Sequence, residues 1–169
     1  DSVKGGHTAL LWSSPESPYE VYAWDGGARR PLSKQNDAFL KDITLAKVEE
    51  ISFKSADGTE VHGFLTYPAG YTAGARYPLI SFNHGGPQSQ TAADFAFNWQ
   101  LFSAAGYAVV AANYRGSTGR GTAYAKGIYA SWGEKDVQDV LASVDEVVHR
   151  GVADRSEERR VGKECRSRW

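Results

Sequence analysis

One stretch of the sequence decides the fold: Leu79-Ile80-Ser81-Phe82-Asn83-His84-Gly85-Gly86-Pro87. Its first four residues form a short, nearly continuous apolar run, which is typical of a strand buried on both faces of a sheet. Two adjacent glycines follow, and glycine lets the main chain approach a ligand closely and adopt dihedral angles that other residues resist. We therefore predict a buried central strand that ends in a loop of accessible backbone.

The segments around this strand alternate between strand and helix patterns. Residues 51–67 are typical of a hairpin about Asp57-Gly58, a dipeptide suited to the turn whose twist matches paired strands. A helical pattern over about 94–105 precedes a second buried strand at 107–113, and an amphipathic helix is predicted over about 134–150. Buried strands that alternate with such helices favour a parallel sheet covered by helices, which places the chain in the α/β class.

The first part of the chain, residues 1–45, has a different, all-β pattern. Strands are predicted near residues 8–13 and 20–24, separated by a turn-rich segment that contains Pro15 and Pro18. Two short strands cannot bury their apolar side chains alone, so they need neighbouring strands. We expect this segment to be the last blade of a larger β-array.

Composition excludes several classes of function. The 169 residues are 41% hydrophobic and 23% charged, as in an ordinary soluble globular protein. No apolar run approaches the roughly 18 residues that span a bilayer, so we expect no membrane segment. The single cysteine, Cys165, cannot form an internal disulfide, and neither a cytoplasmic nor a periplasmic location is favoured. Because the sequence contains no methionine, we interpret it as a fragment or a processed chain.

The two-glycine loop has the chemistry of an oxyanion-binding site. Acyl transfer creates a negatively charged oxygen, and rigidly aimed backbone N–H groups stabilise that charge. In α/β-hydrolases the loop after the third strand supplies one such donor, often from a His-Gly-Gly motif. We predict that His84, Gly85 and Gly86 form this loop, with the Gly86 N–H as donor. The alternative is a simple glycine turn with a structural histidine.

A family resemblance covers residues 48–154 and supports the catalytic interpretation. The motifs that carry it are Ser55-Ala56-Asp57-Gly58-Thr59, Tyr77-Pro78-Leu79-Ile80, His84-Gly85-Gly86-Pro87, Asn113-Tyr114-Arg115-Gly116-Ser117-Thr118-Gly119 and Trp132-Gly133-Glu134-Lys135-Asp136-Val137-Gln138-Asp139. In order and spacing they resemble the start of the catalytic domain of the prolyl oligopeptidase family of serine peptidases, nearest its acylaminoacyl-peptidase and dipeptidyl-peptidase branch. The resemblance implies residues 46–154 to be the N-terminal half of an α/β-hydrolase domain. It also implies that residues 1–45 are the end of a β-propeller.

The catalytic serine of that family is absent from the chain. No serine has glycine at both flanking second positions, and Ser117 comes nearest without the required spacing. Arg115 lies at the end of a strand, where ligands gather in open α/β sheets, so it is a candidate for substrate binding. The alternative role for Arg115 is to brace the glycine loop. Asp136 and Asp139 are interpreted as solvated carboxylates on the outer face of a helix.

Residues 155–169 differ abruptly from the sequence before them. They hold six Lys or Arg and three Asp or Glu, and Arg155-Ser156-Glu157-Glu158-Arg159 matches a translated sequencing adapter. We expect this tail to be an artefact and exclude it from the predicted fold. A basic arm for nucleic acid is the less favoured interpretation, because acidic residues are interleaved with the basic ones.

The sequence therefore predicts a fragment of a serine peptidase that hydrolyses short peptides by acyl transfer. Without a nucleophile the fragment itself is expected to be inactive. We expect no cofactor, no metal and no nucleic-acid partner, since phosphate-loop and zinc-helix motifs are absent from the sequence. An esterase or lipase of the same fold and a non-catalytic binding protein remain the alternatives.

Overall fold

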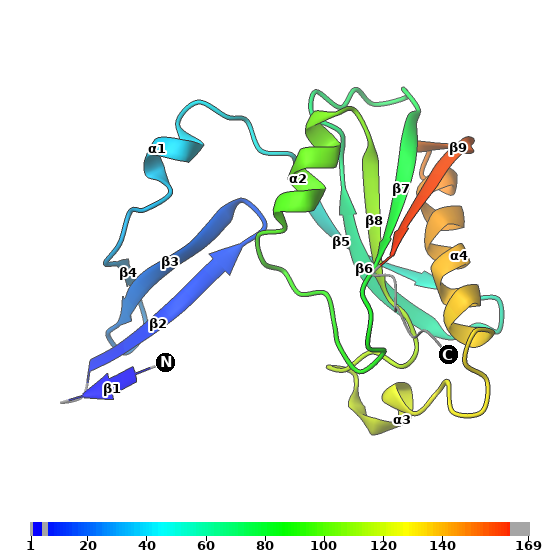
Figure 1. The fold of residues 1–169 in the computed structure, drawn as a ribbon, viewed down its shortest axis with the longest axis horizontal. Helices are drawn as coiled ribbons and strands as arrows, with labels where there is room; N and C mark the ends of the chain where they lie inside the picture. Colours follow the sequence, from blue (N-terminus) through cyan, green and yellow to red (C-terminus); the bar gives the residue numbers. More distant parts are fainter. Residues whose placement is uncertain (1, 5–6, 163–169) are drawn as a thin grey trace, which may run out of the picture. The chain divides into compact units, whose positions relative to one another are not determined.

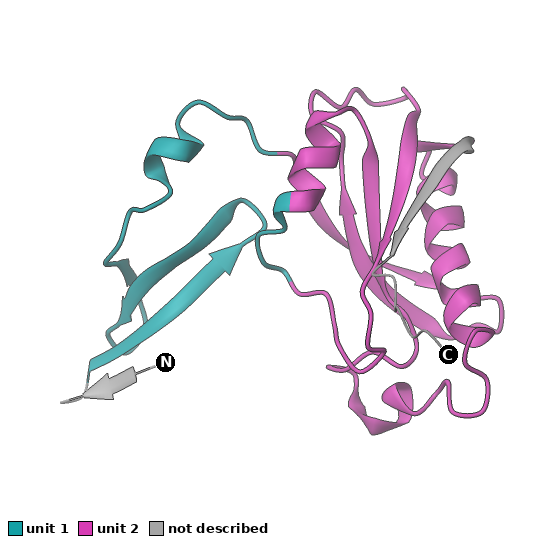
Figure 2. Ribbon diagram, in the orientation of Figure 1, with its two compact units in different colours: residues 1–45, 93–97 teal, residues 46–92, 98–169 magenta. Residues whose placement is uncertain are grey.

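The computed structural model describes residues 2–4 and 7–162, which form two compact units (Figures 1 and 2). The first unit comprises Asp1–Leu45 with Ala93–Phe97, and the second comprises Ala46–Ala92 with Asn98–Trp169. Among the described residues, no helix has the length and apolar character needed to cross a membrane.

The first unit is a four-stranded antiparallel meander in the order β1-β2-β3-β4. Its strands are β1 (Ser2–Lys4), β2 (His7–Ser14), β3 (Ser17–Trp24) and β4 (Arg29–Pro31), and a short helix α1 (Asp37–Leu40) follows. The two strands predicted from sequence are confirmed as β2 and β3. Leu11 of β2 and Leu32, which directly follows β4, are more than half exposed, so this unit leaves apolar side chains uncovered.

The second unit is a five-stranded mixed sheet in the order β5-β6-β8-β7-β9. Its elements along the chain are β5 (Val48–Lys54), β6 (Glu60–Thr66), β7 (Tyr77–Asn83), α2 (Phe97–Ala104), β8 (Ala108–Asn113), α3 (Gly121–Ala125), α4 (Lys135–His149) and β9 (Ala153–Gly162). The hairpin predicted about Asp57-Gly58 is confirmed as β5 and β6. The prediction of a parallel sheet is only partly correct: β7 is parallel to both of its neighbours, but β8 also pairs in antiparallel fashion with β6 of the hairpin.

Helices cover both faces of this sheet, as the alternating pattern predicts (Figure 1). Val144 and Val147 of α4 join a buried cluster with Leu65, Leu79 and Val110. On the other face, Trp99 of α2 lies 6.0 Å from the Phe64 ring and 6.4 Å from the Phe82 ring, measured between centroids. Side chains alternate between the two faces along each strand, so each face of β6 and β7 meets a different helix.

Residues 155–162 belong to β9, although their composition predicts that they lie outside the fold. The backbone of β9 pairs with β7 in parallel, with an irregularity between the Tyr77–Ala153 and Leu79–Glu158 pairs. Ladder hydrogen bonds are made by main-chain groups, so a strand can pair without a particular side-chain sequence. The adapter origin of residues 155–169 stays a prediction. Cys165 lies outside the described residues.

Gly63 makes the close pairing of β6 and β8 possible, so we predict that Gly63→Ala destabilises the second unit. A Cβ at this position would lie 2.5 Å from the Ala111 carbonyl oxygen and 3.1 Å from the Ala112 Cα. Both are backbone atoms and β8 would have to move, which is expected to lower the free energy of unfolding by about 1–3 kcal/mol. Urea unfolding followed by tryptophan fluorescence measures the change. Gly27→Ala is the control, since nothing lies within 4 Å of its added Cβ; equal effects of the two changes would contradict the prediction.

Candidate active site

Two loops meet at one edge of the second unit's sheet. The 84–91 loop follows β7, and the 113–119 loop begins at the last residue of β8. Because β7 and β8 are parallel neighbours, their carboxyl ends lie at the same edge, where open α/β sheets bind ligands. The sequence-predicted residues His84, Gly85 and Gly86 begin the first loop, and Arg115 lies in the second.

His84 joins the start of the 84–91 loop to the 113–119 loop. The Ser117 hydroxyl donates to the Tyr114 carbonyl oxygen at 2.6 Å, so the Ser117 oxygen accepts from His84 Nε2–H, at 2.9 Å. The Tyr114 hydroxyl donates to the His84 carbonyl oxygen at 2.5 Å, and the two rings stack with centroids 4.6 Å apart. Burial lowers the pKa of His84 from its ordinary value, and the contact of Nδ1 with the Gly85 carbonyl oxygen offsets part of this effect.

A second set of hydrogen bonds joins the far end of the 84–91 loop to the 113–119 loop. The Thr118 N–H donates to the Ser89 carbonyl oxygen at 2.9 Å. The Asn113 amide side chain accepts from the Thr91 N–H at 2.7 Å and donates to the Thr91 carbonyl oxygen at 2.9 Å. The 84–91 loop is therefore held at both ends.

The Gly86 N–H lies between these two attachments and remains available. Gly86 is exposed, and within the described part of the chain its N–H donates to no protein acceptor. Its φ of 140° falls in the region that favours glycine. A free backbone donor held between two fixed points can bind a negatively charged oxygen without reorganising.

The contact between His84 and Ser117 resembles a base–nucleophile pair in distance alone. Ser117 is 0% exposed, and its proton is directed at the Tyr114 carbonyl oxygen. A nucleophile must reach the substrate and release its proton to the base, and Ser117 does neither. The pair is therefore a structural connection between the two loops.

Arg115 is a buried bracing residue, and its geometry does not support the substrate-binding role considered from the sequence. The side chain lies in a network with Ser55, Asp57, Thr59 and Asp139, and the residue is 5% exposed. Asp139 accepts from Arg115 Nε at 2.9 Å and from an NH2 proton at 2.7 Å. All five guanidinium N–H groups thus have protein acceptors, which leaves none for a substrate.

The charges of this network are mutually stabilising. The hydrogen bonds that Arg115 donates to Asp139, followed by the one that it donates to Asp57, raise the pKa of Arg115 above its ordinary value. Hydrogen bonds from Thr59 and then from Arg115 hold the pKa of Asp57 well below its ordinary range. The network connects the turn between β5 and β6 to the 113–119 loop and to α4.

The expectation that Asp139 is a solvated surface carboxylate is wrong. The residue is 0% exposed, and it also accepts the Arg115 backbone N–H at 2.8 Å. Sequence reasoning missed a local signal, because Asp139, Ser143 and Val147 recur at four-residue spacing on one helix face. That face is buried against the sheet, so a carboxylate on it requires a partner.

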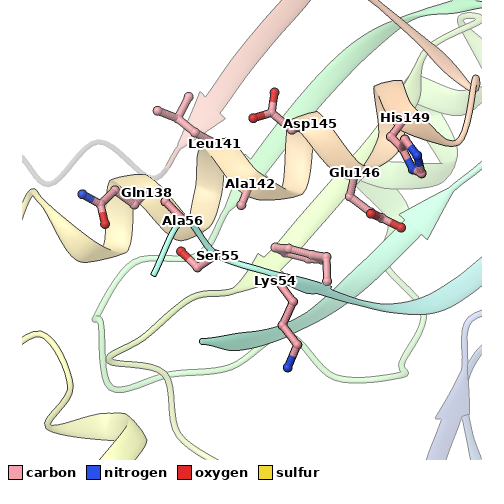
Figure 3. A pocket seen from close by; sticks show the side chains of 10 residues that line it. Lys54, Ser55, Ala56, Gln138, Leu141, Ala142, Asp145, Glu146 and His149 are labelled. Carbon is pink, nitrogen blue, oxygen red and sulfur yellow. The ribbon is translucent and has the colours of Figure 1, made fainter. Parts of the chain in front are cut away.

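A separate hollow of about 460 Å³ lies between the end of β5 and α4 (Figure 3). It contains Ser55, Asp145 and His149, the residue types of a catalytic triad. Figure 3 shows Ser55 towards one end of the hollow and His149 at the other. The Ser55 hydroxyl accepts from Arg115, and no hydrogen bond between Ser55 and His149 is present among the described residues. This hollow does not form a triad.

Because Arg115 and Asp139 form a buried ion pair, we predict that substitutions of two aspartates of α4 differ strongly in their effect on the free energy of unfolding. Asp139→Asn leaves the Arg115 charge without its main counterion and is expected to cost about 3–5 kcal/mol of unfolding free energy. Asp145 forms an exposed ion pair with Arg155, so Asp145→Asn is the matched control, with an expected cost of about 0–1 kcal/mol. Urea unfolding of the two variants makes the comparison. Similar midpoints would show that the Arg115 network contributes little.

Known proteins resemble this chain along most of its length. Residues 93–162 match the sequence model of a family that is described as the prolyl oligopeptidase family. The chain is 36% identical over 145 residues to the uncharacterized peptidase YuxL of Bacillus subtilis (strain 168), covering 85% of this chain and 22% of that protein. It is 35% identical over 150 residues to dipeptidyl-peptidase 5 of Aspergillus fumigatus (strain CBS 144.89 / FGSC A1163 / CEA10), covering 85% of this chain and 20% of that protein.

A solved structure shows the same similarity in three dimensions. An acylaminoacyl peptidase in complex with Z-Gly-Gly-Phe-chloromethyl ketone has a TM-score of 0.82 and 30% identity, covering 95% of this chain and 27% of that one. The chain spans about a fifth of the length of the curated relatives named above. Together, the sequence and fold similarities show that the chain belongs to the prolyl oligopeptidase family.

Proposed function

We propose that this chain supplies the oxyanion-binding part of a serine peptidase that cleaves short peptides by acyl transfer. Residues 46–154 are then the N-terminal half of its α/β-hydrolase domain, and residues 1–45 are the end of a β-propeller. The observation that carries the proposal is the exposed Gly86 N–H, free of protein acceptors within the described chain and held between two sets of hydrogen bonds.

The proposed step is attack of a serine hydroxyl on the scissile peptide carbonyl. The serine oxygen forms a bond to the carbonyl carbon, a histidine base takes the serine proton, and the C=O π electrons move to the oxygen. Gly86 N–H donates to that oxyanion, and the residue after the nucleophile supplies the second donor. Serine, base and second donor come from parts of the intact enzyme outside this chain. The leaving amine then takes the proton as the C–N bond breaks, and water releases the acyl group.

Two observations favour peptides over esters as substrates. The first unit is a four-stranded antiparallel meander, the form of a propeller blade, and its exposed apolar side chains are suited to packing against a neighbouring blade. The relatives named above are peptidases, and the similar solved structure holds a peptide chloromethyl ketone. A propeller beside the site would restrict access to short peptides.

The direct test is turnover by the intact polypeptide that contains these residues. We expect hydrolysis of short peptide anilides, faster than hydrolysis of short acyl esters of the same length, and inactivation by a fluorophosphonate that labels serine. The chain of 169 residues alone is expected to hydrolyse neither. Preference for acyl esters would favour the esterase alternative. Absence of labelling together with absence of turnover would favour a binding protein.

Three histidine variants of the intact enzyme test whether the Gly86 donor acts in the transition state. His84→Ala removes the hydrogen bond to Ser117 and is expected to displace the Gly86 N–H. Because this N–H is proposed to bind the oxyanion and not the bound substrate, kcat should fall by up to about 10²-fold with little change in KM. His84→Gln keeps an N–H donor and should recover part of kcat. His149→Ala is the control, since His149 lies at the end of α4, outside both loops. Equal kcat for His84→Ala and His149→Ala would contradict the oxyanion role.

A further inference from the structure

A chain of three polar contacts runs through the His84 ring. Ser117 Oγ lies 2.6 Å from the Tyr114 carbonyl oxygen, a distance at which the hydroxyl proton lies between the two oxygens. His84 Nε2 lies 2.9 Å from the Ser117 oxygen, and His84 Nδ1 lies 3.3 Å from the Gly85 carbonyl oxygen. Because the hydroxyl proton is already engaged, both ring nitrogens must carry a proton if all the contacts are to be hydrogen bonds.

A neutral imidazole has one ring proton and can satisfy only one of its two contacts. Ser117 is 0% exposed, so an unprotonated Nε2 would leave two acceptors facing each other in a site closed to water. Gly85 is only partly buried, so its carbonyl oxygen can turn towards solvent instead. The neutral ring therefore keeps its proton on Nε2, and the hydrogen bond from Nδ1 to Gly85 is lost.

The Gly85 carbonyl belongs to the same peptide group as the Gly86 N–H. The atoms of a peptide group lie in one plane, so a hydrogen bond that fixes the Gly85 oxygen also fixes the direction of the Gly86 N–H. Among the described residues no backbone N–H donates to the Gly85 oxygen, and the His84 ring is its hydrogen-bonding partner. The protonated ring thus orients the proposed oxyanion donor, and the neutral ring releases it.

The groups around His84 leave its own protonation as the variable. Tyr114 stacks on the ring from the 113–119 loop, and burial, followed by the charge of Asp136 in α4, raises the pKa of the Tyr114 hydroxyl. The buried ion pair between the 113–119 loop and α4 neutralises its own charges. Lys126, from the segment after α3, lines a hollow with Gly86 and not with the ring. Within the described chain, no charged side chain forms a hydrogen bond or ion pair with His84.

We propose that His84 is a positioning residue and that a proton gained at Nδ1 fixes the Gly85–Gly86 peptide group and so aims the oxyanion donor. The inference rests on the proposed function, in which the Gly86 N–H binds the oxyanion. The proton comes from solvent, and no covalent bond other than N–H forms or breaks. Burial lowers the pKa of His84, so the donor is fixed in acid and is released as the pH rises through this lowered pKa.

The first test compares wild type with His84→Gln in the intact enzyme. Glutamine keeps an N–H donor for Ser117 but cannot gain a proton. Hydrolysis of one short peptide anilide is measured from about pH 8 to about pH 5, the range in which histidine titrates. Both enzymes share the catalytic base, so its titration cancels in the ratio of their kcat values. We expect the wild-type kcat to rise relative to His84→Gln by about threefold to tenfold as the pH falls, with a constant ratio of KM values.

Ser117→Ala gives a test that a merely structural histidine would not pass. It removes the acceptor at Nε2, so the neutral ring can place its single proton on Nδ1 and hold Gly85 at every pH. We therefore expect the ratio of kcat between Ser117→Ala and His84→Gln to be independent of pH. His149→Ala is the control, because His149 lies at the end of α4, and this variant should keep the wild-type pH dependence.

NMR of the intact wild-type enzyme, labelled in its glycine carbonyl and amide groups, provides a readout that needs neither turnover nor a folded variant. The Gly85 carbonyl and Gly86 amide signals should shift with pH at the same midpoint as the His84 ring signals. A Gly85 signal that does not follow the ring would overturn the inference.

The outcomes separate this inference from the proposed function. Peptide hydrolysis with a pH-independent kcat ratio between wild type and His84→Gln would overturn the inference and leave the peptidase proposal standing. Retention of the wild-type pH dependence by Ser117→Ala would do the same. Failure to hydrolyse any peptide would overturn the proposed function and, with it, the role of His84 in aiming an oxyanion donor.

Discussion

The buried ion pair of Arg115 and Asp139 is the interaction on which the candidate site depends. Removing two charges from water costs several kcal/mol per ion, and this cost is offset only when the pair is well aligned and its remaining donors are bonded. Here the carboxylate binds both the guanidinium and the Arg115 backbone N–H, and the other guanidinium protons reach Asp57, Thr59 and Ser55. The backbone at Arg115 is consequently fixed at the start of the 113–119 loop.

From this fixed point, hydrogen bonds extend to the 84–91 loop. The Ser117 hydroxyl oxygen accepts a hydrogen bond from His84 Nε2–H, and the Thr118 N–H donates to the Ser89 carbonyl oxygen. Asn113 binds Thr91 on the other side of Arg115. The carboxylate of Asp139 in α4 thus helps to fix the position of the Gly86 N–H, through the 113–119 loop and then the 84–91 loop.

Local patterns in the sequence predicted much of this arrangement. The apolar run before His84, the Asp57-Gly58 turn and the spacing of valines in residues 134–150 each identify an element that the structure contains. These signals are local because side-chain direction repeats every two residues in a strand and every 3.6 in a helix. The glycine pair after the strand likewise marked the loop that carries Gly86.

The partners of buried charges could not be predicted in the same way. Arg115 and Asp57 are far apart in the sequence, and only the pairing of β5, β6 and β8 brings them together. The prediction that Asp139 lies on the outer face is wrong because the position of a residue around the helix, shared here with buried Ser143 and Val147, determines its burial, whereas its charge does not. Strand order could not be predicted either, because no local sequence pattern indicates that β8 pairs with an antiparallel strand.

Amide hydrogen exchange by NMR in the intact enzyme tests the central claim, that Gly86 N–H is a held but unoccupied donor. We expect slow exchange at Thr91 and Thr118, whose N–H groups join the two loops, and fast exchange at Gly86. A peptide aldehyde, which would form an oxyanion with the proposed catalytic serine, should slow exchange at Gly86 and leave Thr118 unchanged. Protection of Gly86 before the aldehyde is added, or no change after it binds, would contradict the account.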